Sequence, residues 1–326
     1  QRLRNLCTMI VLTHGHMHGA EGRWLVGYLS YGGSYATVAK RLGLGKSMVV
    51  CFEPHSRYMV EMGKWGPTAL RTRIAAWFER MQMRHASAAI VPTKAGMDLA
   101  RSWNVTGRLL EQGITIDVAA ARHDATARIR IRNAHRWGDR NVLAYVGKFG
   151  GIYHTAEQYI RFMEGMCAED EGLHFLIITQ QEWLDRLGPM VVRSGLSDRV
   201  TMMPPVPNAE LHQVLSAADV GVVAIPPTPS QAFRTPVKSA HYWAAGLPLL
   251  IPHGVSDDAV ICSEHNVGIV VPDLPMTDAT VTIEQLRMLL NDDRDSLRAR
   301  CMEVAYRYRD TSLMVDKLRD LLEWGS

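Results

Sequence analysis

The chain has 326 residues, of which 47% are hydrophobic and 21% are charged, as in soluble globular proteins of two domains. The formal net charge of +3 is too small to indicate a nucleic-acid-binding protein. No apolar run approaches the roughly 20 residues that span a bilayer, and no signal peptide is visible. Because no cysteine lies in a C-x-x-C pair, we expect free thiols and a reducing, cytoplasmic location; the five are Cys7, Cys51, Cys167, Cys262 and Cys301.

The first motif along the chain is "HGHMH", in which His14, His16 and His18 would share one side of an extended segment. Imidazoles at this spacing suit zinc, but no further ligand spacing supports such a site. We therefore predict no metal.

The first half of the chain alternates predicted strands and helices, with less regularity than the second. We expect strands in "RWLVGYLSYGG" (23–33), "SMVVCFEP" (47–54) and "AAIVPT" (88–93). The expected helices are "SYATVAKRLGL" (34–44), a basic helix from about Ala69 to His85, and "KAGMDLARSW" (94–103). Glu53, His55 and Ser56 follow the second strand, where Glu53 and His55 would alternate sides of an extended segment.

The basic helix allows two interpretations. It carries an apolar stripe and several cations against a single acid, Glu79. The favoured interpretation packs the stripe in the core and leaves the basic face in solvent; the alternative is an interfacial helix that binds anionic lipid. The stripe is Leu70, Ile74, Trp77, Phe78 and Met81, and the cations are Arg71, Arg73, Arg80, Arg84 and His85.

The segment "DATARIRIRNAHR" (124–136) predicts a helix that Asp124 caps, with Arg128, Arg132 and Arg136 on one face. It lies between two sheet-forming regions, so we expect the domain boundary near residues 118–140.

The second half is regular. Strand patterns occur at 141–147, 173–179, 199–205, 220–226 and 268–272, with helices at about 153–169, 181–194 and 208–218, and two more at the C-terminus. Strands that alternate with helices at this interval predict βαβ units and a doubly wound parallel sheet.

Residues 233–258, "FRTPVKSAHYWAAGLPLLIPHGVSDD", predict a helix, a buried strand and a second helix. Thr235 and Pro236 suit the start of the first helix, and Gly246 and Pro248 its end. Ser256 or Asp257 can cap the next helix. The loops of such a segment lie where parallel sheets bind ligands.

These pieces resemble the nucleotide-sugar-dependent glycosyltransferases of the GT-B fold, and in particular the large retaining family 4 that includes sucrose synthase. The matching pieces are "YVGKFG", "LHFLIIT", "RVTMMPPVPNAELHQVLSAADVGVVAIP", "TPVKSAHYWAAGLPLLIP" and "GVSDD…NVGIVV". They stand in the family's order and at roughly its spacing. The stretch "ERMQMRHASAAIVPT" is similar to the one before the last N-terminal strand of the family.

The resemblance implies two Rossmann-like, doubly wound domains. Residues 1–120 would form the acceptor side, 121–140 a linker helix, and 141–326 the donor-binding domain with its C-terminal helices. The family's first half is longer, so we expect one or two opening strands to be missing from the N-terminal domain.

The resemblance also implies the site residues. His55 and Lys148 would be catalytic, and Val206 and Pro207 would contact the base through their backbone. The groups implied at the donor and its phosphates are Gly147, Lys148, Gly150, Arg234, Lys238, His241, Gly254, Val255 and Ser256. For each there is a plain alternative: a surface lysine in a βα turn, a solvated Lys238, a core His241 or His55, or an ordinary helix cap at 253–258.

Three positions depart from the family pattern. Phe233 and His241 stand where the family usually has two glutamates eight positions apart, and His154 stands where it usually has lysine. A histidine can still bind ribose hydroxyls, whereas Phe233 cannot replace a carboxylate.

The predicted function is metal-independent sugar transfer, with retention, from a nucleoside-diphosphate sugar to a hydroxyl of a glycan or lipid-linked saccharide. No cofactor besides the donor is expected, and no nucleic acid; peripheral contact with a membrane is part of the hypothesis. Two alternatives remain open. One is a nucleotide-sugar epimerase, for which Glu53 and Asp257 are the only candidate carboxylates; the other is a degenerate subunit without catalysis.

Overall fold

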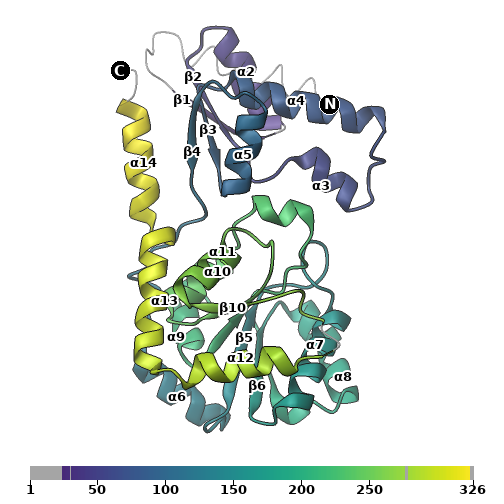
Figure 1. The fold of residues 1–326 in the computed structure, drawn as a ribbon, viewed down its shortest axis with the longest axis vertical. Helices are drawn as coiled ribbons and strands as arrows, with labels where there is room; N and C mark the ends of the chain where they lie inside the picture. Colours follow the sequence, from purple (N-terminus) through teal and green to yellow (C-terminus); the bar gives the residue numbers. More distant parts are fainter. Residues whose placement is uncertain (1–23, 30, 276–277, 324–326) are drawn as a thin grey trace. The chain divides into compact units, whose positions relative to one another are not determined.

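The structure is a computed structural model, and it describes residues 24–29, 31–275 and 278–323. The contacts among these residues divide the chain into two units. The first unit runs to Gly113 and also contains Thr228–Arg234 and the chain from Val315 onward. The second contains Ile114–Pro227 and Thr235–Met314. Each unit is built around its own parallel sheet, so the predicted α/β fold with two Rossmann-like domains is confirmed (Figure 1).

The sheet of the first unit has the strand order β1-β2-β3-β4, and all neighbours are parallel. Its strands are β1 (Trp24–Tyr28), β2 (Lys46–Val50), β3 (Ala88–Val91) and β4 (Arg108–Glu111). Its helices are α2 (Tyr31–Arg41), α3 (His55–Glu61), α4 (Leu70–His85) and α5 (Lys94–Ser102).

Three predictions for the first unit need correction. Neither β4 nor α3 is among the elements predicted from the sequence; α3 follows Pro54 and has only seven helical residues, which give little periodic signal. It also extended the first strand to Gly33, whereas α2 already begins at Tyr31.

The sheet of the second unit has the strand order β10-β9-β8-β5-β6-β7, again all parallel. Sequence order therefore rises in both directions from the pair β5–β8, which makes the carboxyl ends of these two strands the switch point where such sheets bind ligands. The strands are β5 (Asn141–Val146), β6 (Leu173–Ile178), β7 (Val200–Met203), β8 (Val220–Val222), β9 (Leu249–Pro252) and β10 (Gly268–Val271).

Helices connect and follow these strands at nearly the predicted places. They are α6 (Ala125–His135), α7 (Ala156–Glu169), α8 (Gln181–Arg193), α9 (Asn208–Ser216), α10 (Val237–Ala244), α11 (Asp258–His265), α12 (Thr280–Asn291), α13 (Arg294–Arg309) and α14 (Thr311–Glu323), with short 3₁₀ turns at Ser197–Arg199 (η1) and Pro229–Phe233 (η2). Three helices follow β10 rather than the predicted two. Asp292 and Asp310 take extended conformations and divide the helical pattern, although neither is a glycine or proline.

Helix α6 is part of the second unit. Asp124 caps it as predicted. Arg128 and Arg132 of the predicted basic face bind the buried carboxylate of Asp219, at 2.7 and 3.1 Å. The segment expected to link the domains is therefore held against the second sheet.

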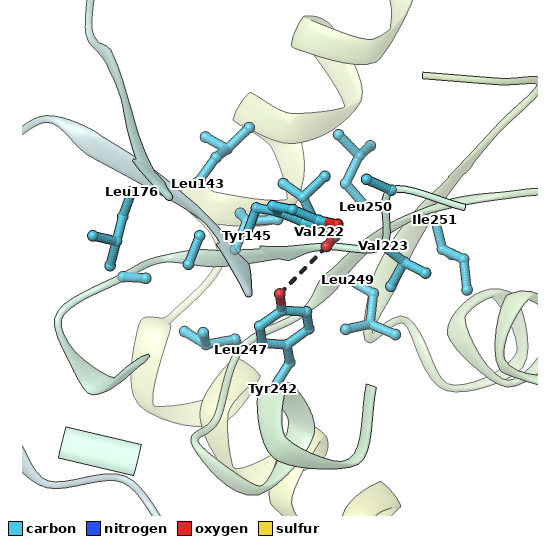
Figure 2. Close-up of a cluster of buried hydrophobic side chains, with 14 of the residues drawn as sticks. Leu143, Tyr145, Leu176, Val222, Val223, Tyr242, Leu247, Leu249, Leu250 and Ile251 are labelled. Carbon is cyan, nitrogen blue, oxygen red and sulfur yellow. Dashed lines mark hydrogen bonds between the residues drawn. The ribbon is translucent and has the colours of Figure 1, made fainter. Parts of the chain in front are cut away.

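The core of the second unit also fixes the switch point (Figure 2). The ladder between β5 and β8 ends at the pair Ala144–Gly221. Beyond it, the hydroxyl of the fully buried Tyr242 accepts a hydrogen bond from the Val146 N–H at 2.9 Å and donates to the Val222 carbonyl at 3.4 Å. Its ring lies over Gly221, where an added Cβ would be 2.3 Å from the ring. Tyr242 thus separates the two strand ends and satisfies their backbone groups.

Among the described residues, no helix combines the length and the apolar composition needed to cross a bilayer. Within the same ranges Cys51, Cys167, Cys262 and Cys301 are free thiols, as predicted.

Candidate functional site

The turn that follows β5 lies at the switch point of the second sheet. Gly147, Gly150 and Gly151 all have positive φ, which glycine adopts at little cost. The Tyr145 hydroxyl donates to the carbonyl oxygen of Lys148 at 2.5 Å and so fixes the shape of the turn. The Lys148 side chain is exposed.

A pocket of about 430 Å³ opens beside this turn. It brings together three of the predicted residues, Gly147, Lys148 and Val206, and the predicted Pro207 flanks it as the N-cap of α9. The buried Oγ1 of Thr179 makes no hydrogen bond within the described chain. The remaining lining residues are Val146, Tyr153, Ile178, Thr179, Gln180, Pro205, Asn208 and Leu211.

Lys238 of α10 points its amine at the same turn. Its Nζ is buried, lies 4.5 Å from the ring centroids of Tyr145 and Tyr153, and makes no hydrogen bond among the described residues. A Cβ added to Gly147 would lie only 2.9 Å from this nitrogen. Burial lowers the pKa of Lys238 to about 7. A buried amine that has two aromatic rings nearby but no hydrogen-bond partner among the described residues is costly to charge, and an anion at the turn would offset that cost.

The rest of α10 differs in detail from the prediction. The helix begins at Val237 with Pro236 as N-cap, so Thr235 is not the cap that was expected. His241 is half-buried, and burial lowers its pKa.

The turn after β9 contains several polar groups that form no hydrogen bond within the described chain. Gly254 and Ser256 both have positive φ, which is uncommon for serine. The backbone N–H groups of Gly254, Val255 and Ser256 donate to no acceptor within the described chain. The Ser256 Oγ is buried and also has no hydrogen-bond partner there. Asp257 occupies the N-cap position of α11, one of the two predicted places, but its side chain makes no capping hydrogen bond there. Such a turn can bind an anion.

His154 does not join this arrangement. It is buried, and its Nε2 lies 2.9 Å from Asp273 Oδ1. Burial lowers the pKa of His154 in spite of this carboxylate. The imidazole therefore lies next to Asp273 and does not line the pocket. The resemblance had implied a cation at this position, because the family usually has lysine there.

The carboxyl edge of the first sheet carries the predicted His55. It is the first residue of α3 and not part of an extended segment, so the argument from alternating sides was wrong. Its ring packs edge-on against Trp65 at 5.7 Å between centroids. A pocket of about 360 Å³ lies here, lined by Tyr28, Leu29, Gly32, Val50, Phe52, Glu53 and His55.

Arg234 also belongs to the first unit. Its Nε donates to Glu53 Oε2 at 2.9 Å, and its guanidinium lies 4.5 Å from the Tyr58 ring centroid. Phe233 precedes it in η2, and η2 is tied to the first unit by Ser230, whose N–H and hydroxyl both donate to Glu61. The structure gives Arg234 a carboxylate partner, and its role at the donor phosphates stays a prediction.

Sequence reasoning missed the two tyrosines around Lys238 and the Glu53–Arg234 pair. Tyr145 and Tyr153 stand close to Lys148 in the sequence, but Lys238 lies far along the chain and only the fold brings it between them. The hypothetical metal ligands His14, His16 and His18 lie outside the described residues, and the described ones contain no cluster of potential metal ligands.

No family model matches the sequence, and neither does any curated protein. The fold, in contrast, matches many solved structures. Sucrose-phosphate synthase from Thermosynechococcus elongatus superposes with a TM-score of 0.72 and 17% identity, over 99% of this chain and 79% of that one. Anabaena HepE in complex with UDP superposes with a TM-score of 0.71 and 13% identity, over 97% of this chain and 81% of that one.

A third structure, the N-terminal domain of trehalose-6-phosphate phosphatase from Candida albicans, gives a TM-score of 0.72 and 11% identity, over 98% of this chain and 76% of that one. Identities this low establish the fold and not the activity. The two parallel sheets, their strand orders and these superpositions together show that the chain has the GT-B fold.

Proposed function

We propose that this protein transfers a sugar from a nucleoside-diphosphate donor to an acceptor hydroxyl. The observation that carries the proposal is the amine of Lys238, which is buried against Gly147 and makes no hydrogen bond among the described residues. Gly147 and Lys148 both line the pocket beside this turn. Two cations around one glycine-rich turn suit a diphosphate. In support, HepE of the same fold has been solved with UDP and with UDP-glucose.

The pocket beside the turn would hold the nucleoside. Its volume of about 430 Å³ lies in the range of small-molecule sites. The base would meet the backbone at Val206 and Pro207, and His241 would bind the ribose. The free N–H groups at Gly254, Val255 and Ser256 would bind phosphate oxygens, and Gly150 would let the turn approach them.

In the reaction, the bond between the anomeric carbon and the diphosphate oxygen breaks while a bond from the acceptor oxygen to that carbon forms. Negative charge grows on the diphosphate, and the acceptor hydroxyl loses its proton. Fixed cations next to the diphosphate lower this barrier, which is the role we assign to Lys148 and Lys238. With two cations there, the transfer needs no metal. We assign His55 to the sugar, and propose retention of configuration with a glycan or lipid-linked saccharide as acceptor.

A second candidate is a subunit that binds nucleotide without catalysis. Phe233 in the place of an acidic residue favours it, and a fold does not by itself determine a reaction. An epimerase is less well supported, because the carboxylate of Glu53 is already paired with Arg234.

The test is a thermal-shift panel of UDP, GDP, ADP and TDP, followed by incubation with the matching nucleotide sugars. We expect one diphosphate to raise the melting temperature, since a ligand that binds only the folded state stabilises it. Release of that diphosphate in the presence of acceptors supports transfer, an epimerised sugar supports the epimerase, and binding without turnover supports the non-catalytic subunit. No shift with any diphosphate would contradict the proposal.

A further inference from the structure

Helix α4 of the first unit turns a polar face toward the protein. Its Glu79 and Gln82 are each only 2% exposed. Glu79 accepts hydrogen bonds from the N–H of Ser56 at 2.7 Å and from its hydroxyl at 2.6 Å. Gln82 donates to the Ser34 hydroxyl at 2.6 Å. Because these bonds satisfy buried polar groups, they fix which side of the helix faces inward.

Four of the five residues of the apolar stripe of α4 consequently face solvent, and the fifth, Met81, is partly buried. The exposed fractions are 71% for Leu70, 47% for Ile74, 55% for Trp77 and 48% for Phe78. These positions share one side of a helix, and the Trp77 and Phe78 rings contact each other edge to face at 4.9 Å. The favoured interpretation of the sequence, a stripe packed in the core, was therefore wrong.

The same surface is strongly cationic. Arg73, Arg80 and Arg84 are exposed and form no ion pair within the described ranges, while the one acid of the helix, Glu79, is buried. At the C-terminal end of α4, burial together with the charges of Arg41, Arg84 and Lys40 lowers the pKa of His85. Positive charge thus surrounds the exposed aromatic residues on a single helix.

We propose that α4 binds peripherally to the surface of a bilayer that contains anionic lipid. Trp77 and Phe78 enter the interface between headgroups and acyl chains, where aromatic side chains are favoured, and the arginines contact lipid phosphates. The positive charge of α4 argues against a second copy of this chain as the partner that covers its exposed face. A symmetric contact would bring the same arginines of both copies together, and like charges repel. The inference is independent of the proposed sugar transfer.

The test is flotation with phosphatidylcholine vesicles, with and without phosphatidylglycerol, at low and high salt. The wild-type protein should float with the anionic vesicles only, and less so as salt rises, because salt screens surface charge. Trp77→Ser/Phe78→Ser and Arg73→Glu/Arg80→Glu should each lower the partition coefficient by about tenfold or more. The matched control is Val192→Ser/Arg193→Glu, an exposed apolar–arginine pair at the end of α8, which should float like the wild type.

A second measurement uses lipids with brominated acyl chains, which quench nearby tryptophan fluorescence. Trp77→Phe should still float but should lose most of the quenching seen in the wild type. Equal binding to neutral and anionic vesicles, no binding to either, or unaltered flotation of both double variants overturns the proposal. So does a dimer in solution that Trp77→Ser/Phe78→Ser turns into a monomer, because α4 would then be a subunit contact. No nucleotide is present in these assays, so their outcome is separate from that of the proposed reaction.

Discussion

The amine of Lys238 lies directly against Gly147, so close that a Cβ on this glycine would be 2.9 Å from the nitrogen. The same Cβ would be 3.0 Å from the Tyr145 hydroxyl, and Gly147 has a φ of +151° that side chains rarely adopt. One residue without a side chain thus allows a strand end, a tyrosine and a buried cation to meet.

Gly147→Ala should abolish the thermal shift by the nucleoside diphosphate. The new methyl group displaces the Lys238 amine and strains the backbone of the turn. The control is Gly195→Ala, which has a φ of +71° and no atom within 4 Å of the added Cβ. Both variants should lose about 1 kcal/mol of stability or somewhat more, but only the control should keep its full response to nucleotide. Equal thermal shifts in the two variants would show that the contact between Gly147 and Lys238 is not needed for nucleotide binding.

Nucleotide affinity should depend on pH through Lys238. Burial lowers the pKa of this amine to about 7, so it is charged below that pH and neutral above it. A diphosphate requires the charged form, and the affinity should therefore fall by up to about tenfold per unit between roughly pH 7.5 and 9. Lys238→Met should bind more weakly and show no such slope. Calorimetric titrations at several pH values check this; parallel profiles for the two proteins would refute it.

Lys148→Ala should lower kcat by roughly 10²–10³, the usual effect of removing one preorganised group that stabilises charge in the transition state. Its side chain is exposed and supports no core, so the melting temperature should change little. Lys64→Ala, an exposed lysine between α3 and α4, is the control and should change neither quantity. Turnover within about threefold of wild type would mean that Lys148 is an ordinary surface lysine.

Asp219→Ala should destabilise the second unit by about 3–5 kcal/mol, because it removes a buried carboxylate and leaves three partly buried arginines without their counter-charge. Arg128, Arg132 and Arg294 all bind this carboxylate. The control is Asp98→Ala, whose exposed pair with Arg101 contributes at most about 1 kcal/mol. Urea unfolding of both variants measures the difference; a loss near that of the control would contradict the prediction.

Low pH should remove the stabilisation that the Asp219 carboxylate contributes to the second unit. Burial raises the pKa of Asp219, but the three arginines and the Val142 N–H outweigh it and hold the pKa below the usual value. The stabilisation is therefore complete above the unfolded-state pKa of about 3.9 and is lost as the pH falls through the lower folded-state pKa.

Much of the fold could be predicted from the sequence because its signals are local. Asp124 marks a helix start that the structure reproduces, and the short apolar runs of the second half are all strands. Local signals also located the glycine-rich turn with Lys148. They failed where the pattern was too short, as in α3, or where the helix break at Asp292 had no glycine or proline.

The tertiary structure alone decided two features that matter for function. The sequence named Lys238, but only the fold places its amine between Tyr145 and Tyr153 and under Gly147, because the residues come together through the pairing of β5 with β8. The sequence also specified the apolar stripe of α4. In the structure, Glu79 accepts hydrogen bonds from Ser56 on the opposite side of the helix, so that side is buried and the stripe is exposed. The helical period of a sequence shows that two faces exist, but the neighbouring groups determine which face is buried.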